Sequence, residues 1–275
     1  MRRLRNLRAW LVDRAVRRGW WPGDRDYARF VVVTHYRCGS NWFLSLLRSH
    51  PRVVAHSELF FPRHIYWGSA AHSLGADEPY LMRIRERSPT EFLNRAVFRP
   101  YARHTLAVGF KLMYSQVEEE LRAALLADDD LRIIHLRRSN ILRILISQEL
   151  ARRTGAMSST SEADSRRRLD RAGKVELSVR QCRKQFERIL RFQDEWRGRA
   201  HLEFDYEDLL RDPQGAAGRA FDLLGIPRRP ASSPLVRQTS RGLGELVENL
   251  EELAAAFGGT EWEWMFEGEE EGRIR

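Results

Sequence analysis

The sequence has little cysteine, no metal-ligand motif and no long apolar run. Its two cysteines, Cys38 and Cys182, cannot build a disulfide framework in a chain of 275 residues, and this usage fits a reducing cytoplasm. The eight histidines form no H-x-H or H-E-x-x-H pattern and no C-x-x-C pair occurs, so no metal site is expected. No apolar stretch approaches the length of a membrane span, and the first residues lack the apolar core of a signal peptide. These absences predict a cytoplasmic protein that uses no metal.

Lysine is also scarce, although the chain is strongly basic. The net charge is +9, and the 47 basic residues include only three lysines, Lys111, Lys174 and Lys184. The Walker A pattern G-x-x-x-x-G-K-S/T does not occur, which argues against an ordinary nucleotide kinase. Because the arginine fork holds phosphate or sulfate with two hydrogen bonds, an anionic ligand is expected. The charge alone would also suit nucleic acid or an acidic membrane, but the arginines are spread along the chain and no nucleic-acid motif occurs.

Strands and helices alternate through the middle of the chain. Apolar and β-branched runs predict strands at 30–34, 52–55, 105–112, 131–136 and 200–204, with helical spacing of apolar residues between them. This order predicts an α/β fold of three layers, in which helices flank a central parallel sheet and ligands bind at the carboxyl ends of the strands.

The ends of the chain differ from this central domain, which we expect to span residues 30–257. Residues 1–29 form a basic amphipathic arm, with apolar residues at helical spacing: Leu4, Leu7, Leu11 and Ala15. The arm is expected to pack on the domain or to be partly ordered, and the alternative is peripheral contact with the inner face of an anionic membrane. Residues 258–275 form an acidic tail that is expected to be disordered, and the polar stretch 154–173 is expected to be a mobile loop.

The first predicted strand ends at a turn rich in small polar residues. After Val31-Val32-Val33 the chain reads Arg37-Cys38-Gly39-Ser40-Asn41-Trp42, and an apolar periodic segment then begins. A strand, a small-residue turn and a helix can hold a phosphate, because the helix offers free N–H groups and glycine lets the backbone approach closely. The alternative is an ordinary turn in which Ser40 caps the helix.

A second basic junction follows another predicted strand. His135-Leu136-Arg137-Arg138 ends that strand, and Ser147 lies inside the next helix. Two positive charges at a helix N-terminus are unfavourable without an anion. The pair therefore predicts a second anion site at a strand end, and the alternative is a solvated basic helix start.

Both junctions resemble those of sulfotransferases that use 3′-phosphoadenosine-5′-phosphosulfate. The first resembles the family's 5′-phosphosulfate loop, and the resemblance extends to Gly109-Phe110-Lys111-Leu112-Met113 and to the run 205–213, covering roughly residues 30–256. The chain is most similar to the bacterial carbohydrate-type sulfotransferases, the trehalose sulfotransferase group. The resemblance implies a nucleotide-kinase-like α/β domain, 3′-phosphoadenosine-5′-phosphosulfate as the donor, and no metal.

The resemblance also implies roles for the two junctions. Arg37 would meet the 5′-phosphosulfate, together with the rest of its loop: Cys38, Gly39, Ser40, Asn41 and Trp42. The family places an arginine at the second strand end and a serine on the following helix around the donor's 3′-phosphate. The distance from Arg138 to Ser147 is one residue longer than is usual, so Arg137 and Arg138 compete for this role.

Other family features imply the remaining parts of the site. A late loop with Arg237 and Gln238 would fold over the nucleotide. Glu58 follows the second strand in a setting where related enzymes place the general base, and His56 is the runner-up. Lys111 lies between apolar residues and would approach the transferred group, or would point outward by the strand's period of two.

The sequence thus favours an enzyme that transfers a sulfuryl group to a hydroxyl on a carbohydrate or glycolipid. We expect the acceptor pocket to be built from residues 57–88 and 154–174, both irregular in sequence. One alternative is a nucleotide-kinase-like phosphotransferase. The other is a non-catalytic module that binds an anion, nucleic acid or a membrane.

Overall fold

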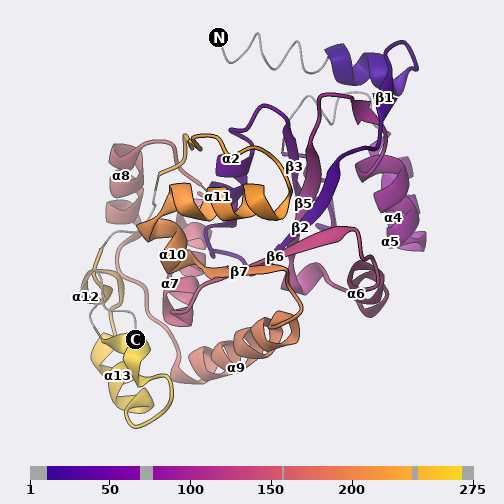
Figure 1. Ribbon diagram of the computed structural model, residues 1–275. Helices are drawn as coiled ribbons and strands as arrows, with labels where there is room; N and C mark the ends of the chain where they lie inside the picture. Colours follow the sequence, from indigo (N-terminus) through magenta and orange to yellow (C-terminus); the bar gives the residue numbers. More distant parts are fainter. Residues whose placement is uncertain (1–10, 69–76, 157, 237–240, 268–275) are drawn as a thin grey trace.

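A computed structural model describes residues 11–68, 77–156, 158–236 and 241–267. Its centre is a sheet of five parallel strands in the order β3-β5-β2-β6-β7 (Figure 1). The strands are β2 Ala28–Thr34, β3 Val53–Glu58, β5 Ala107–Met113, β6 Leu131–Arg137 and β7 Leu202–Asp205. A short antiparallel pair, β1 Gly23–Asp24 and β4 Tyr101–Ala102, lies beside them. All five predicted strands are present, with ends shifted by a few residues.

Helices surround this sheet, which confirms the predicted α/β architecture. In chain order the longer ones are α2 Ser40–Leu47, α4 Glu78–Arg87, α6 Glu119–Leu126, α7 Ile141–Thr154, α8 Glu162–Ala172, α9 Val179–Trp196, α11 Pro213–Leu223 and α13 Leu250–Phe257. The shorter ones are α5 Pro89–Phe92, the π-helix η1 Leu93–Val97, the 3₁₀ helix η2 Tyr114–Gln116, α10 Tyr206–Arg211, α12 Leu243–Leu246 and the 3₁₀ helix η3 Glu263–Phe266.

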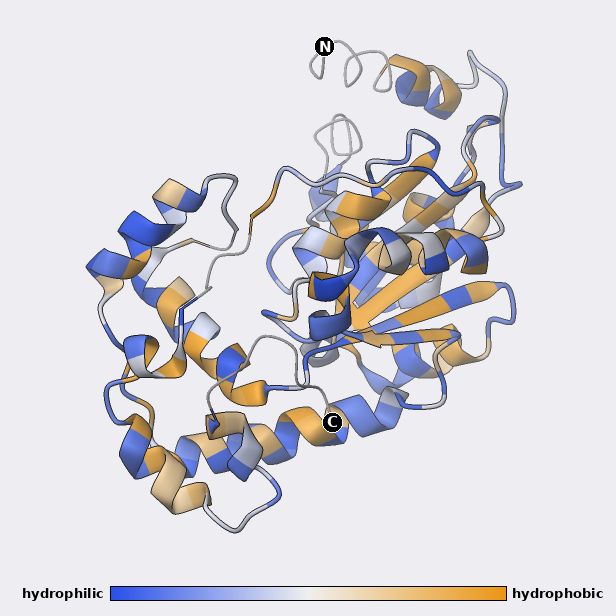
Figure 2. Cartoon of the chain, turned by 60° about the vertical axis from the view of Figure 1, so that its left-hand side comes forward, coloured by the Kyte–Doolittle hydropathy of each residue, from blue (hydrophilic) through white to orange (hydrophobic). Residues whose placement is uncertain are grey.

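The central strand β2 shows why the sheet needs helices on both faces. Phe30 and Val32 pack against α2, α10 and α11, whereas Val31 and Val33 pack against α5, α6 and the end of α9. Successive side chains of a strand point to opposite faces, and all four of these are completely buried. Figure 2 shows this apolar centre, with helices around it that are polar on their outer sides. A parallel sheet buried on both faces brings all its carboxyl ends to one edge.

The polar stretch 154–173 differs from the expected loop, because most of it forms helix α8. Ser161 caps this helix by accepting a hydrogen bond from the Asp164 backbone N–H, and Leu169 is buried against α7. Arg168 pairs with Asp164 one turn earlier, at 2.7 Å. A cap, one buried leucine and ion pairs at helical spacing are enough to hold a segment whose composition is otherwise that of a loop.

The start of the predicted tail also differs from the expectation. Residues 258–267 include η3, and Trp262, Met265 and Phe266 are buried beside Phe186 of α9. The Phe266 side chain thus belongs to a third apolar cluster, which α7, α8, α9, α12 and α13 form beside the sheet. Residues 268–275 lie outside the described residues. Within the described ranges, no helix has the length and hydropathy to cross a bilayer.

Candidate functional site

A hollow of about 200 Å³ lies at the carboxyl edge of the sheet, where the topology predicts a ligand. Strands β2, β3, β5 and β6 all end beside it. Its lining comes from Tyr36, Arg37, Gly39, Ser40, Asn41, Trp42, Glu58, Lys111, Met113, Arg138, Ser147, Ser158, Tyr206, Leu210, Leu235 and Val236. Most residues that the sequence singled out are therefore brought together in one place.

The turn after β2 holds an unusual backbone conformation. Gly39 is the N-cap of α2 with φ of 75°, and a Cβ there would lie 2.4 Å from the Tyr206 ring. Arg37 also has a positive φ, 66°, which is strained for a residue with a side chain. Strain of this kind persists only where the surroundings impose it. Here it turns the Arg37 side chain toward the hollow while glycine keeps the backbone open to a ligand.

Two arginines and a serine meet on one side of the hollow. Arg37 Nε donates to Ser147 Oγ at 2.9 Å, and Arg138 Nη1 donates to the Arg37 carbonyl oxygen at 3.2 Å. Burial lowers the pKa of Arg37, and the charge of Arg138 lowers it further. Two adjacent guanidinium groups repel each other in a site with little water. An anion bound between them would remove this repulsion, so the cluster fits a phosphate or sulfate.

Arg137 and Arg138 occupy different positions relative to the hollow. Arg137 Nε pairs with Asp205 on β7 at 3.2 Å and does not line the hollow. Arg138 is 4% exposed and lies over the Tyr206 ring, 4.7 Å from its centroid. Its Nε has no hydrogen-bond partner among the described residues, and the Glu207 carboxylate is 3.9 Å away. Of the two arginines, Arg138 is therefore the one that lines the hollow.

A buried lysine connects the turn after β2 to the end of β3. Lys111 Nζ donates to Asn41 Oδ1 at 2.6 Å and pairs with Glu58 Oε1 at 3.0 Å. Lys111 is 1% exposed, and burial lowers its pKa while the Glu58 carboxylate raises it. The second Glu58 oxygen accepts from Gln116 Nε2 at 3.2 Å. Each oxygen of the Glu58 carboxylate thus has one polar partner that holds it in place.

Some predicted site residues do not reach the hollow. His56 is completely buried and bonds to the Tyr101 hydroxyl at 3.0 Å and the Trp67 carbonyl oxygen at 3.3 Å, so the structure does not place it as a base. The Cys38 side chain is buried under the turn, and burial raises its pKa to about 12. Arg237 and Gln238 lie outside the described residues.

Other residues at the site escaped the sequence analysis. Gln116 lies in the 3₁₀ helix after β5, and Tyr206 begins α10. Loops from two distant segments also meet over the hollow, where the Val236 N–H donates to the Ser159 carbonyl oxygen at 3.0 Å. Gln116 could have been noticed because it lies three residues after the end of β5. Nothing in the neighbouring sequence indicates that it would bond to Glu58. No cluster of three metal-ligating side chains occurs in the described part of the chain.

Comparison with known proteins adds independent information. Two relatives are nodulation protein H of Rhizobium tropici, 27% identical over 248 residues, and that of Rhizobium meliloti strain 1021, 27% identical over 253 residues. Each alignment covers 86% of this chain, with 92% and 94% of the respective relatives. A crystal structure of a sulfotransferase from Alicyclobacillus acidocaldarius aligns with 83% of this chain and 90% of its own, at 17% identity and a TM-score of 0.44.

A family profile decides the assignment. The profile described as the sulfotransferase family matches residues 29–230, which is more than half of the chain. The match begins in β2 and ends after α11, so it spans the parallel sheet and includes Arg37, Glu58, Lys111 and Arg138. The chain belongs to the sulfotransferase family.

Proposed function

We propose that the protein moves a sulfuryl group from 3′-phosphoadenosine-5′-phosphosulfate to a hydroxyl of a carbohydrate or glycolipid. The observation that carries the proposal is the position of Lys111. Its ammonium group bonds both to Asn41, in the first turn of α2, and to the Glu58 carboxylate. A donor anion and a general base would therefore meet at the same cation, as the transfer of SO₃ requires.

The cluster formed by Arg37, Arg138 and Ser147 has two parts, which fit the two anionic groups of such a donor. Arg37, Ser40 and the open backbone at Gly39 would hold the 5′-phosphosulfate. Arg138 and Ser147 would hold the 3′-phosphate. Since Arg37 bonds to Ser147, the two subsites share a boundary. Glycine at position 39 fits this assignment, because any side chain there would collide with Tyr206.

Glu58 is the group that we assign as general base. It would take the proton from the acceptor hydroxyl as that oxygen forms a bond to sulfur, while the bond between sulfur and the bridging phosphate oxygen breaks. Lys111 and Arg37 would neutralise the charge that develops on the bridging oxygen. Gln116 would keep the Glu58 carboxylate in one orientation through its hydrogen bond at 3.2 Å.

The segment after Glu58 supports a carbohydrate acceptor. Four aromatic residues follow the strand, but Phe60 and Trp67 pack into the core beside Phe92. Phe61 is partly exposed and Tyr66 is exposed, and the centroids of their rings are 5.2 Å apart. Accessible aromatic faces near a general base suit the apolar face of a sugar ring. This aromatic pair is the part of the predicted acceptor region that we assign to substrate binding.

Calorimetric titration with adenosine 3′,5′-bisphosphate tests the donor site. We expect micromolar binding that exceeds the binding of ATP. Arg138→Ala should lose about 1.5–3 kcal/mol, the contribution of a hydrogen bond to a charged group, whereas Arg137→Ala serves as the matched control and should bind normally. Equal binding of ATP, or an unchanged Arg138→Ala variant, would contradict the donor assignment.

Turnover with labelled donor and a panel of sugars tests the proposed reaction and the role of Glu58. Glu58→Gln should keep nucleotide affinity and lose roughly 10²–10⁴-fold in kcat, the usual contribution of a general base. Sulfation that continues at the original rate in this variant would remove Glu58 from the mechanism. Turnover with phosphoryl donors but not with the sulfuryl donor would instead support the phosphotransferase alternative.

A further inference from the structure

In the N-terminal segment, residues 11–21, a carboxylate is buried and the largest apolar side chains are exposed. In helix 11–17 the side chains that face the domain are Asp13 and Val16, each 8% exposed. The segment's largest apolar side chains point away from the domain instead, with Leu11 at 52%, Trp20 at 71% and Trp21 at 55% exposure. A segment stabilised only by packing on its own domain would bury its tryptophans and expose its carboxylate.

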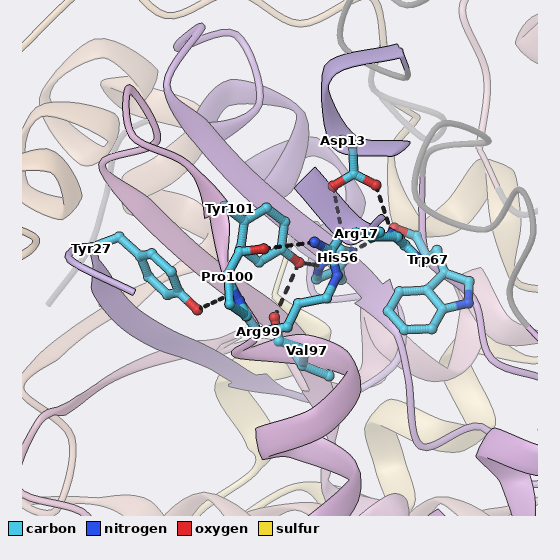
Figure 3. A network of polar contacts seen from close by, with 9 residues as sticks. All are labelled: Asp13, Arg17, Tyr27, His56, Trp67, Val97, Arg99, Pro100 and Tyr101. Atoms are coloured by element: carbon cyan, nitrogen blue, oxygen red, sulfur yellow. Dashed lines mark hydrogen bonds and ion pairs between the residues drawn. The ribbon is translucent and has the colours of Figure 1, made fainter. Parts of the chain in front are cut away.

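An ion-pair network holds this orientation in place (Figure 3). Asp13 pairs with Arg99 Nη2 at 2.5 Å and with Arg17 Nε at 2.9 Å. The Arg99 guanidinium lies 4.1 Å from the Tyr101 ring centroid, and the Tyr101 hydroxyl bonds to His56 on β3. The connection runs from the helix to the central sheet without interruption. The exposed side of the segment is therefore fixed relative to the domain.

The exposed tryptophans belong to a segment that is rich in arginine. Arg18 lies over the Trp20 ring, 4.8 Å from its centroid, and Gly19 with φ of 70° makes the turn that brings the two together. Arg14 is exposed on the same helix. Residues 1–10 add four arginines and no acidic residue to the sequence. Indole rings beside arginines have the chemistry of the boundary between lipid headgroups and acyl chains.

We propose that residues 11–21 dock the protein on an anionic phospholipid surface. Trp20, Trp21 and Leu11 would enter the headgroup boundary, and the neighbouring arginines would meet the lipid phosphates. A nucleic acid would match the charge, but it offers no apolar environment for Leu11. The proposal does not depend on the sulfotransferase reaction, since it concerns a surface built by other residues.

Vesicle sedimentation with the full chain tests the proposal. We expect binding to phosphatidylcholine vesicles that contain phosphatidylglycerol, little binding to phosphatidylcholine alone, and weaker binding in high salt. The double variant W20S/W21S should bind the mixed vesicles about tenfold or more weakly, because two indoles leave the boundary. Trp264→Ser is the matched control. Trp264 is 46% exposed on η3, which follows α13, and α13 lies on the opposite side of the molecule from the N-terminal helix (Figure 1). Its loss should change nothing.

Three results would overturn the proposal. The first is an absence of vesicle binding by the wild-type chain. The second is equal vesicle binding by wild type and W20S/W21S when both show the same thermal unfolding transition. The third is a monomer–dimer equilibrium, or binding of a short DNA duplex, that W20S/W21S abolishes while vesicle binding persists, since the surface would then serve a second copy or a nucleic acid. Quenching of tryptophan emission by lipids brominated near the headgroup should occur in wild type and decrease in the variant.

Discussion

Replacing Gly39 by alanine should weaken nucleotide binding at the proposed donor site through a displacement of Tyr206. The new Cβ would lie 2.4–2.5 Å from two ring carbons of Tyr206, so the ring must move. That ring supports the Arg138 guanidinium at 4.7 Å. Gly39 also has φ of 75°, where a side chain costs about 1–2 kcal/mol. The substitution thus combines backbone strain with a displaced ligand residue.

Gly225 separates these two effects. It has φ of 64°, and a Cβ there would meet nothing within 4 Å. Alanine at position 225 should therefore cost the strain alone, about 1 kcal/mol after the gain from a less flexible unfolded chain. Gly39→Ala should cost about 1–3 kcal/mol more, because the ring and its neighbours must repack. Urea unfolding of the two variants measures this difference.

Nucleotide affinity gives the decisive measurement. If Arg138 loses its position, affinity for adenosine 3′,5′-bisphosphate should fall by about 1.5–3 kcal/mol, or roughly 10- to 150-fold, in Gly39→Ala and remain unchanged in Gly225→Ala. Normal nucleotide binding by a folded Gly39→Ala variant would refute the reasoning. It would mean that Tyr206 is free to move without consequence for Arg138.

Three further perturbations follow from the geometry. Gln116→Leu removes the hydrogen bond at 3.2 Å to Glu58, so kcat should fall about tenfold with unchanged nucleotide affinity, and Ser115→Ala serves as the neighbouring control in the same assay. Asp13→Asn leaves Arg99 buried without its carboxylate, so urea unfolding should show a loss of about 3 kcal/mol; wild-type stability would contradict the anchoring role of this pair. Burial lowers the pKa of His135, so below the ordinary histidine pKa of about 6.5 the unfolded chain takes up a proton that the native state resists. The free energy of unfolding should therefore decrease as the pH falls from there, and His135→Gln should flatten that decrease in urea titrations; an equally steep decrease in the variant would count against it.

Local sequence was sufficient for features that one strand and its following turn provide. The residues from Arg37 to Trp42 are contiguous, so strand period, glycine and helix start together predicted an anion-binding turn. Glu58 was found after a predicted strand, and Lys111 was found inside another predicted strand. Their contact was not predictable, because it depends on β3 and β5 being neighbours, with Glu58 opposite Lys111. Strand order is decided by long-range packing, which a local pattern does not contain.

The misplacement of His56 has a specific cause. Two residues apart on a regular strand, His56 and Glu58 would share one face, and this made His56 a candidate base. A register shift between Ala55 and Glu58 breaks that alternation. His56 therefore turns to Tyr101 and the core while Glu58 reaches the hollow. No residue type in the segment marks the bulge in advance.

The α8 and C-terminal segments show a different limit. Their composition, which is rich in charged residues, led to the predictions of a mobile loop and a disordered tail. Both segments are held by a few apolar residues that meet partners elsewhere in the chain, such as Phe266 with Phe186. Charge content predicts solvation well, but it does not show where a single aromatic side chain finds a pocket.

The contact between Asn140 and residue 265 has a consequence for protein synthesis. Asn140 caps α7, the helix that carries Ser147, and its side chain Nδ2 donates to the Met265 carbonyl oxygen at 3.0 Å. Residue 265 leaves the ribosome long after residue 140, and domains fold as their last contacts become available. The nascent chain thus lacks this support for the helix that carries Ser147 until residue 265 has been translated. A tag or truncation near residue 265 would extend that incomplete state into the finished protein.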